Sequence, residues 1–242
     1  EANAVLIRSA TRMDAEAKTL GTGEYVDDLK VPGMLMAAVL RTPIPRARIL
    51  SIDVSAAAAI EGVAAVMTAA DIPGQQKWGH LKRDWPAMIG EGEETRYIGD
   101  ALAIVAARTK KIAQEAVRSI RLEYEELSPL LSPQESLADT APKLHPDGNV
   151  LSRVAFARGD ANQAIETAAH VVTRSYHTPF TEHAFLEPES ALAVPGSDGK
   201  LTVYVGSQSV FDDHHGIAAI LGLPGEQVRV IGQTLRAGPI AI

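Results

Sequence analysis

The sequence predicts a two-domain α/β protein, and three observations support this prediction. Short segments in which apolar and polar residues alternate predict strands, and stripes of apolar residues at helical spacing lie between them. The length of 242 residues suffices for two domains of ordinary size. Residues 132–149 contain three prolines and lie between the two regularly patterned regions. Such a stretch is typical of a linker between domains.

The composition excludes several classes of protein. Apolar residues make up 46% of the chain, which is enough for hydrophobic cores, and the formal net charge of −7 argues against nucleic acid as the main partner. The chain has no cysteine, so it contains no disulfide scaffold and no thiolate-bound zinc or iron–sulfur cluster. No apolar run reaches the roughly 18 residues that a membrane span needs. We therefore expect no membrane span and a cytoplasmic location, since no secretory signal is visible at Glu1.

In the N-terminal half, compact apolar or alternating runs between turn-forming residues predict strands over residues 34–41, 48–54 and 63–68. A more regular unit follows, in which an apolar strand over 101–107 precedes a helix and an alternating strand over 121–126. The helix has Thr109 as a plausible N-cap and an apolar stripe formed by Ile112, Ala113, Ala116, Val117 and Ile120. Such a strand–helix–strand unit favours parallel pairing of its two strands.

Residues 75–94 differ in character from their surroundings. They hold both tryptophans of the chain and an acidic run at 91–94, and they show no clear period. We therefore expect a surface loop. Loops of this length are often functional or partly disordered, and a solvated insertion without function is the alternative.

The C-terminal half begins with weaker signals. Residues 151–157 and 170–177 are candidate strands, and Asp160 is the natural N-cap of a helix over 161–168. A clearer unit follows over 200–231. There a strand over 201–208 leads into a helix over 211–221, which Gly222 and Pro224 end, and a short strand over 228–231 comes last.

Gln208 is the candidate binding residue of this unit. It lies at the predicted strand end, directly before a helix, which is a common place for a polar side chain that faces a ligand. The alternative is a glutamine that caps the helix or bonds a loop. Asp212 and Asp213 fall in the first helical turn, where acidic residues suit the helix dipole.

No metal site and no catalytic residue is assigned from the residues alone. Glu187 and Glu189 flank Pro188 in a polar stretch with Glu182 and His183, and they could act as an acid–base pair, bind a metal or bond backbone amides. Adjacent His214 and His215 lie about 100° apart on a helix, so they do not easily share one ion. The sequence shows no phosphate-binding glycine loop and no G-x-S-x-G motif.

A series of short motifs runs along both halves of the chain. In the first half they are Gly23-Glu-Tyr-Val-Asp-Asp28, Arg46-Ala-Arg-Ile-Leu-Ser-Ile-Asp53, Arg96-Tyr-Ile-Gly-Asp100 and Glu123-Tyr-Glu-Glu126. In the second half they are Gly159-Asp160, Glu182-His-Ala-Phe-Leu-Glu-Pro-Glu189, Val205-Gly-Ser-Gln208 and Leu221-Gly-Leu-Pro224. Together these motifs resemble the molybdenum-binding subunit of the xanthine dehydrogenase/aldehyde oxidase family. Each motif is modest, but their order and spacing make the resemblance specific over nearly all of residues 10–231.

The resemblance implies an α+β fold. An α/β hammerhead domain is expected over residues 1–136, followed by a partial α+β molybdopterin-binding domain over 145–242. The implied function is that of a partial molybdenum hydroxylase subunit, which hydroxylates a heterocycle or aldehyde with water as the oxygen source. The implied cofactor of the complete enzyme is molybdopterin with its molybdenum. Gln208 matches the family glutamine of the V-x-S/T-Q element, which lies beside the oxygen ligands of the metal.

One departure from the family pattern bears on activity. After the strand that contains Val228 and Val230, the family has a glycine-rich G-G-x-F-G-G-K-E segment, and residues 231–242 do not match it. We therefore expect this chain to lack cofactor and turnover by itself and to associate with itself. The expected partners are iron–sulfur and flavin subunits, or the remainder of the molybdenum subunit. The alternative is a non-catalytic fragment or an assembly or binding module with the same fold.

Overall fold

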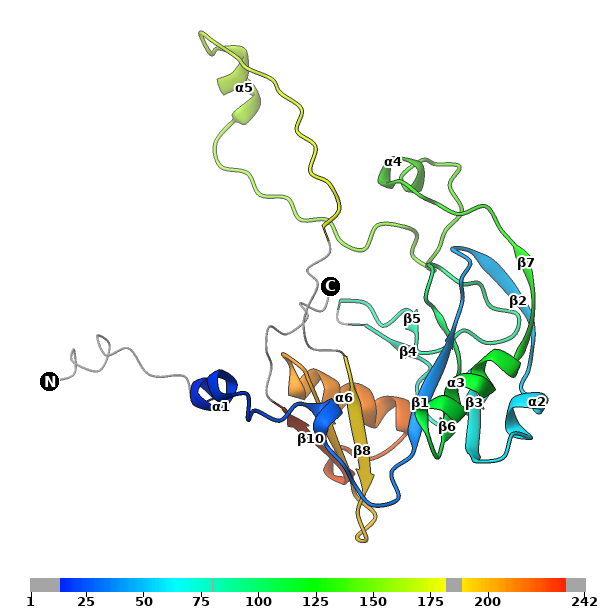
Figure 1. The fold of residues 1–242 in the computed structure, drawn as a ribbon. Helices are drawn as coiled ribbons and strands as arrows, with labels where there is room; N and C mark the ends of the chain where they lie inside the picture. Colours follow the sequence, from blue (N-terminus) through cyan, green and yellow to red (C-terminus); the bar gives the residue numbers. More distant parts are fainter. Residues whose placement is uncertain (1–13, 80, 182–188, 234–242) are drawn as a thin grey trace, which may run out of the picture. The chain divides into compact units, whose positions relative to one another are not determined.

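The computed structural model describes residues 14–79, 81–181 and 189–233 (Figure 1). The chain divides into two units, one formed by residues 1–130 and 185–242 and the other by residues 131–184. Helices and strands are mixed throughout the first unit, and the α+β fold class is confirmed. No helix in the described residues is long and apolar enough to cross a membrane.

The first sheet of the larger unit has β6 (Ala101–Ala107) at its centre. β1 (Met36–Arg41) and β3 (Val63–Thr68) pair with it on either side, both antiparallel. Because β6 is an almost continuous apolar run, it fits the middle of a sheet that is covered on both faces. Its fully buried residues are Leu102, Ala103, Val105 and Ala107.

Helix α3 (Lys110–Ser119) follows β6 as predicted. The hydroxyl oxygen of Thr109 accepts a hydrogen bond from the Ile112 backbone N–H at 3.2 Å, which confirms the predicted N-cap. The apolar stripe of α3 packs against β1 and β6, and Ala113 and Ala116 are fully buried.

The predicted parallel pairing across α3 is wrong. β7 (Arg121–Glu126) pairs antiparallel with β2 (Ala47–Asp53) in a separate two-stranded sheet and makes no ladder with β6. The residues of β7 explain this placement. Parallel strands are normally buried on both faces, whereas all of β7 except the half-buried Leu122 is exposed.

One hydrophobic core joins these two sheets with α3. Its members come from β2, β6, α3, the short helix α2 (Ser55–Ala58) and the segment before β6. They are Ile49, Ile52, Ala57, Ile89, Leu102, Ala103, Val105, Ala116 and Ile120. Three further short elements of the larger unit are α1 (Ala15–Leu20), η2 (Val26–Asp28) and η3 (Ala69–Asp71).

The surface loop predicted over residues 75–94 is only partly correct. The segment contains a short hairpin of β4 (Lys77–Trp78) and β5 (Trp85–Pro86), and Ile89 is fully buried in the core. The carboxylate of Glu91 accepts the Ile52 backbone N–H at 2.8 Å, and that of Glu93 accepts the Gly90 N–H at 2.8 Å. These bonds join side chains to backbone groups at irregular intervals along the chain. They therefore produce no regular alternation of apolar and polar residues in the sequence.

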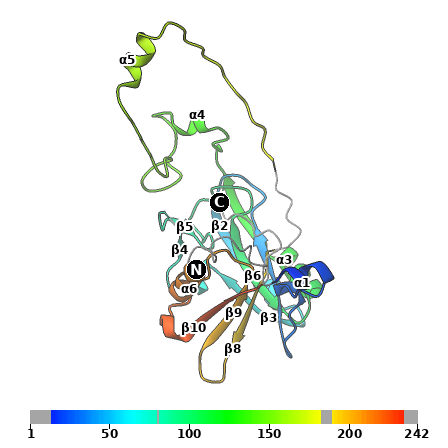
Figure 2. The same cartoon turned by 90° about the vertical axis from the view of Figure 1, so that its left-hand side faces the viewer.

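The second three-stranded sheet of the larger unit has the order β10–β9–β8, with β9 in the middle (Figure 2). β9 (Leu201–Val205) pairs antiparallel with β8 (Ala191–Pro195) and parallel with β10 (Val228–Gly232). Helix α6 (Val210–Leu221) and the turn η4 (Gly225–Gln227) connect the two parallel strands. Gly222 ends α6 in the left-handed conformation with φ of 64°, as predicted.

Helix α6 is attached to the segment that follows β3. The backbone N–H groups of Gly74 and Gln75 donate to the carbonyls of Ile220 and Ala219, at 2.9 and 2.8 Å. At Gly216, in the middle of α6, an added Cβ would lie 2.6 Å from the ring of Trp78. The helix therefore approaches this segment more closely than a side chain at position 216 would allow.

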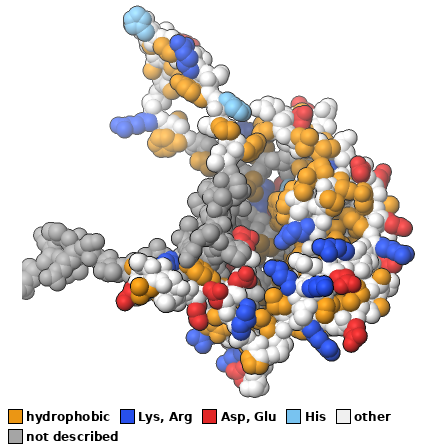
Figure 3. Space-filling view, in the orientation of Figure 1, with side chains coloured by type: hydrophobic (Ala, Val, Ile, Leu, Met, Phe, Trp, Pro, Cys, Tyr) orange, Lys and Arg blue, Asp and Glu red, His pale blue; other side chains and the backbone are white. Residues whose placement is uncertain are grey.

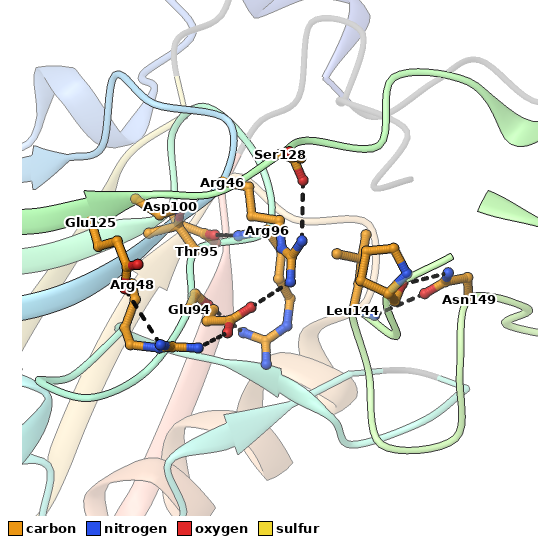
Figure 4. Close-up of polar contacts among 12 residues, drawn as sticks. Arg46, Arg48, Glu94, Thr95, Arg96, Asp100, Glu125, Ser128, Leu144 and Asn149 are labelled. Atoms are coloured by element: carbon orange, nitrogen blue, oxygen red, sulfur yellow. Dashed lines mark hydrogen bonds and ion pairs between the residues drawn. The ribbon is translucent and has the colours of Figure 1, made fainter. Parts of the chain in front are cut away.

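The smaller unit contains the proline-rich stretch predicted as a linker, and part of that stretch is folded on itself. Helix α4 (Pro133–Ser136) begins where the Ser132 hydroxyl accepts the Glu135 N–H at 3.2 Å. The side chain of Asn149 donates to the carbonyls of Ser136 and Pro142 at 3.0 Å each, and it accepts the Leu144 N–H at 2.8 Å (Figure 4).

Helix α5 (Ala161–Glu166) lies farther along the smaller unit and has the predicted N-cap. The carboxylate of Asp160 accepts the Gln163 N–H at 2.9 Å. The strands predicted over 151–157 and 170–177 are not formed, and both segments are without regular structure. The physical reason is that a strand exists only when it is paired, and no strand pairs with them in the described residues.

A charged cluster attaches β2 to the segment before β6 (Figure 4). Glu94 accepts hydrogen bonds from Arg46 and Arg48, each at 2.8 Å between guanidinium nitrogen and carboxylate oxygen. Burial alone would raise the pKa of Glu94, but the two guanidinium groups outweigh it and hold the pKa below its usual value. Arg46 also donates to the Ser128 carbonyl at 3.1 Å.

Asp100 organises the turn that leads into β6. It is 2% exposed, and one carboxylate oxygen accepts the backbone N–H groups of Arg96 at 2.6 Å and Tyr97 at 3.3 Å. Burial raises the pKa of Asp100, and these bonds together with the charges of Arg96 and Arg41 offset only part of that effect.

We expect Glu94→Gln to destabilise the protein by about 1 kcal/mol at neutral pH, a small cost because the side chain is 32% exposed and solvent screens the pairs. Since the folded state lowers the pKa, the stabilisation is present above the unfolded value of about 4.3 and is lost as pH falls through the folded value. Chemical denaturation from pH 3 to 8 measures this difference. Glu125→Gln is the control, because Glu125 contacts Arg48 at 3.4 Å and is 57% exposed. An equal effect of both variants would contradict the assignment.

Asp100→Ala should cost about 2–3 kcal/mol of unfolding free energy, because it leaves two backbone N–H groups without an acceptor. Asp100→Asn keeps an acceptor and should cost less. Because the pKa of Asp100 is raised, its contribution to stability changes with pH in the opposite direction to that of Glu94. The contribution of the protonated group is present below about 3.9, the unfolded value, and is lost as pH rises through the folded value. Wild type should therefore lose stability relative to Asp100→Asn as pH rises from 4, and a pH-independent difference would refute the pKa direction.

Candidate functional site

Gln208 lies in the loop between β9 and α6, beyond the strand on which it was predicted. β9 ends at Val205, because its last residue pairs with the first residue of β8, Ala191, and the last residue of β10, Gly232. The ladder therefore has no partner for residues 206–208. The apolar–polar alternation of a strand, which placed Gln208 on a strand face, does not apply in this loop. The residue does lie just before the helix, as predicted, and its side chain is exposed.

The loop lies at the carboxyl edge of two parallel strands. We use the name carboxyl edge for residues 206–209, the first turn of α6 and residues 232 and 233. The Gln233 N–H donates to the Val205 carbonyl at 2.8 Å, and a Cβ at Gly232 would lie 3.0 Å from a methyl carbon of Val210. These contacts bring the chain after β10 beside the loop after β9. Ligands of open α/β sheets bind at this edge.

The first turn of α6 has its own hydrogen bonds. The Ser207 hydroxyl accepts the Ser209 N–H at 3.0 Å, and the Ser209 hydroxyl donates to the Asp212 carboxylate at 2.6 Å. Asp212 and Asp213 lie in the first turn, as the sequence predicted, where they suit the helix dipole. One carboxylate oxygen of Asp213 is buried and has no hydrogen-bond partner within the part of the chain that the structure describes.

Phe211 is a residue of this edge that the sequence analysis did not single out. It belongs to the first turn of α6, and 77% of its surface is exposed. The sequence contained a signal for this exposure. Phe211 and Ile220 are nine residues apart, and at about 100° per residue this places them on opposite sides of the helix. The carboxyl edge therefore presents a polar amide and an exposed aromatic ring within a few residues of each other.

The other candidate residues that the structure describes do not form a metal site. The rings of His214 and His215 meet edge-on with centroids 5.5 Å apart, and His214 donates to the Gly225 carbonyl at 2.9 Å. The residues that the structure describes contain no group of three histidine, aspartate or glutamate side chains able to hold a metal ion. Glu189 is exposed, and the acid–base candidates Glu182, His183 and Glu187 lie outside the described residues.

The polar side chain of the carboxyl edge can form hydrogen bonds to a ligand. Gln208 offers an amide that can donate and accept. The amide carries no charge, and it stands two residues before a twelve-residue helix whose last turn is bonded to the segment after β3. A neutral donor of this kind can bond an oxygen atom of a ligand, and nothing in its chemistry conflicts with a cofactor that brings its own metal ligands.

Two family models match the chain. The model described as "Aldehyde oxidase and xanthine dehydrogenase, a/b hammerhead domain" matches residues 20–128. The model described as "Molybdopterin cofactor-binding domain" matches residues 144–236, which include β8 to β10, α6 and Gln208. The two matches follow one another in the order that the sequence motifs indicated.

Individual relatives agree with the family models. The chain is 37% identical over 227 residues to a probable xanthine dehydrogenase subunit of Bacillus subtilis, covering 94% of this chain and 30% of that protein. It is 36% identical over 234 residues to the nicotinate dehydrogenase large molybdopterin subunit of Eubacterium barkeri, covering 97% of this chain and 55% of that protein.

A solved structure shares both fold and sequence with this chain. The aldehyde oxidoreductase from Desulfovibrio gigas superimposes with a TM-score of 0.82 at 27% identity, covering 92% of this chain and 26% of that one. The chain thus spans between about a quarter and about half the length of these three proteins. Matched over most of its length by the two models and by these relatives, the chain belongs to the xanthine dehydrogenase/aldehyde oxidase family, as part of its molybdenum-binding subunit.

Proposed function

We propose that this chain is part of the molybdenum-binding subunit of a hydroxylase that acts on a heterocycle or an aldehyde and takes its oxygen from water. We also propose that Gln208 binds the cofactor. The observation that carries the proposal is the exposed amide of Gln208 at the carboxyl edge of β9 and β10, inside the region that matches a molybdopterin-binding domain.

When bound, the molybdenum cofactor supplies the redox chemistry. The chain's own contribution is positional. The amide nitrogen of Gln208 would donate a hydrogen bond to an oxygen atom of the cofactor. Helix α6, whose last turn is bonded by Gly74 and Gln75, would keep the loop that carries this donor in place. A preorganised donor of this kind acts without reorganisation during the reaction.

The proposed partners are iron–sulfur and flavin subunits, together with the remainder of the molybdenum subunit. The names of the relatives support this proposal, since both describe one subunit of a larger enzyme. In the absence of such partners the isolated chain is expected to carry no cofactor and to associate with itself. The cytoplasmic location stays a prediction. We also propose domains over 1–136 and 145–242, supported by family matches that end at residue 128 and begin at residue 144.

The change that tests Gln208 is Gln208→Ala in a complex reconstituted with the complementing chains. Turnover should fall roughly 10- to 1,000-fold, since loss of one preorganised donor costs up to about 1,000-fold. The midpoint of thermal unfolding should stay the same, because an exposed loop side chain contributes little to the core. Turnover of aldehyde and heterocycle substrates, molybdenum content and unfolding are measured on the same preparations.

Gln114→Ala is the matched control, since Gln114 is an exposed glutamine on α3 with no place at the carboxyl edge. It should leave both turnover and unfolding unchanged. Equal turnover of the Gln208 variant and wild type would reject the assignment of Gln208. A reconstituted complex without molybdenum would instead support the alternative of a binding or assembly module.

A further inference from the structure

Helix α6 is packed so closely that two positions at its contact with the rest of the larger unit leave no room for a side chain. The smaller unit is different, since every described residue over 151–181 is exposed and Figure 3 shows hydrophobic side chains open to solvent around α5. The two close positions are Gly216, in the middle of α6, and Gly74, in the segment after β3.

Gly216 lies in the interior of a helix, where glycine is less favourable than alanine. Its surroundings explain the choice. A Cβ at position 216 would lie 2.6, 2.8 and 3.0 Å from three carbon atoms of the Trp78 indole ring, whereas ordinary contacts of a Cβ begin at 3.4 Å. The ring therefore occupies the space in which a side chain of residue 216 would begin.

The C-terminal end of α6 is bonded to the same segment. The N–H groups of Gly74 and Gln75 donate to the carbonyls of Ile220 and Ala219 at 2.9 and 2.8 Å. The last carbonyl groups of a helix have no partner within the helix, so these two bonds act as its cap. A Cβ at Gly74 would lie 2.7 Å from the Ile220 carbonyl oxygen, so the two backbones touch directly.

Residues 74–78 are a firm support for α6 because they are bonded to other parts of the larger unit. The carbonyl of Gln76 accepts the Ala87 N–H at 2.8 Å, and its side-chain amide donates to the Ala69 carbonyl at 3.3 Å. Trp78 pairs with Trp85 in the hairpin of β4 and β5. When the contact at position 216 is overfilled, the helix is therefore the part that shifts.

We infer that Trp78 is a positioning residue for Gln208, and that it acts through its contact with Gly216. The inference rests on the proposed function and adds a residue to the candidate site. Trp78 lies in the region that matches the hammerhead model, whereas Gln208 lies in the region that matches the molybdopterin-binding model. The position of the cofactor-binding amide thus depends on both regions.

The geometry of a helix gives the size of the effect. At about 1.5 Å per residue, position 216 lies about 5 Å from the bonded last turn and Val210 lies about 14 Å from it. A Cβ at position 216 must shift by 0.8 Å to move from 2.6 Å to ordinary contact at 3.4 Å. Tilting about its bonded end as a rigid rod, α6 would move its first turn nearly three times as far, about 2 Å. A misplacement of about 1 Å can cost on the order of 100-fold in rate.

The first test needs no cofactor and uses the isolated full chain. Nitrogen-15 NMR follows the side-chain amide signals of Gln208, which are identified by their absence from the Gln208→Ala spectrum. These signals should shift in Gly216→Ala. Gly23→Ala is the matched control, because it adds the same methyl group where the nearest atom would lie 3.8 Å away, and it should leave the signals unchanged.

Trp78→Leu shows whether the indole ring is the cause. It removes the ring atoms that a methyl group at position 216 would meet, and residues in contact have coupled effects. Gly216→Ala should therefore shift the Gln208 signals much less in the Trp78→Leu background than in wild type. Trp78→Leu alone withdraws the support from α6 and should also shift these signals, which keeps the test decisive if Gly216→Ala does not fold.

The second test measures turnover per bound molybdenum in the complex reconstituted with the complementing chains. Gly216→Ala should lower kcat about 10- to 100-fold and change KM less than about threefold, because the displaced amide bonds the cofactor and not the substrate. In the Gln208→Ala background, the same change should lower kcat less than about threefold further, since Trp78 acts through Gln208. A merely structural role would lower kcat equally in both backgrounds.

Three outcomes would overturn the inference. They are unchanged Gln208 signals in both Gly216→Ala and Trp78→Leu, an equal shift from Gly216→Ala with and without the indole ring, and an equal loss of kcat with and without the Gln208 amide. Failure of the proposed function is distinguishable from these outcomes. In that case Gln208→Ala itself leaves turnover unchanged, while the NMR signals still report whether Trp78 positions Gln208.

Discussion

The double pairing of β9 is the constraint on which the candidate site depends. Backbone bonds to β8 on one side and to β10 on the other fix β9 in the middle of its sheet. Because both ladders stop at Val205, the chain must leave the sheet there and turn into α6 within a few residues. The end of β9 therefore sets the position of Gln208, which lies in the short stretch between the last paired residue and the first helical turn.

Helix α6 is a second constraint on the position of the loop that contains Gln208. A helix has no freedom to shift one end independently of the other, so the bonds from Gly74 and Gln75 to its last turn also orient its first turn. Gly216 makes this attachment close, because the Trp78 ring occupies the space where a side chain would begin. Residues far from Gln208 in sequence therefore share in holding its loop.

The region before β6 shows how an irregular segment becomes as well determined as a strand. Charged side chains there bond backbone groups and one another, as Glu91 does with Ile52 and Glu94 does with Arg46 and Arg48. Such bonds give hydrogen-bond partners to polar groups that burial would otherwise leave unpaired. The acidic run is thus part of the packing between β2 and β6, which is a structural role for residues that look solvated in the sequence.

The sequence alone determined the elements whose cause is local. The caps at Thr109 and Asp160, the C-terminal glycine of α6 and the apolar run of β6 depend on neighbouring residues, and each was predicted. The tertiary structure decided everything that depends on a partner distant in the chain. It placed β7 beside β2, buried Ile89, ended β9 at Val205 and left residues 170–177 without a ladder, because pairing between strands is a contact between distant segments that no local period encodes.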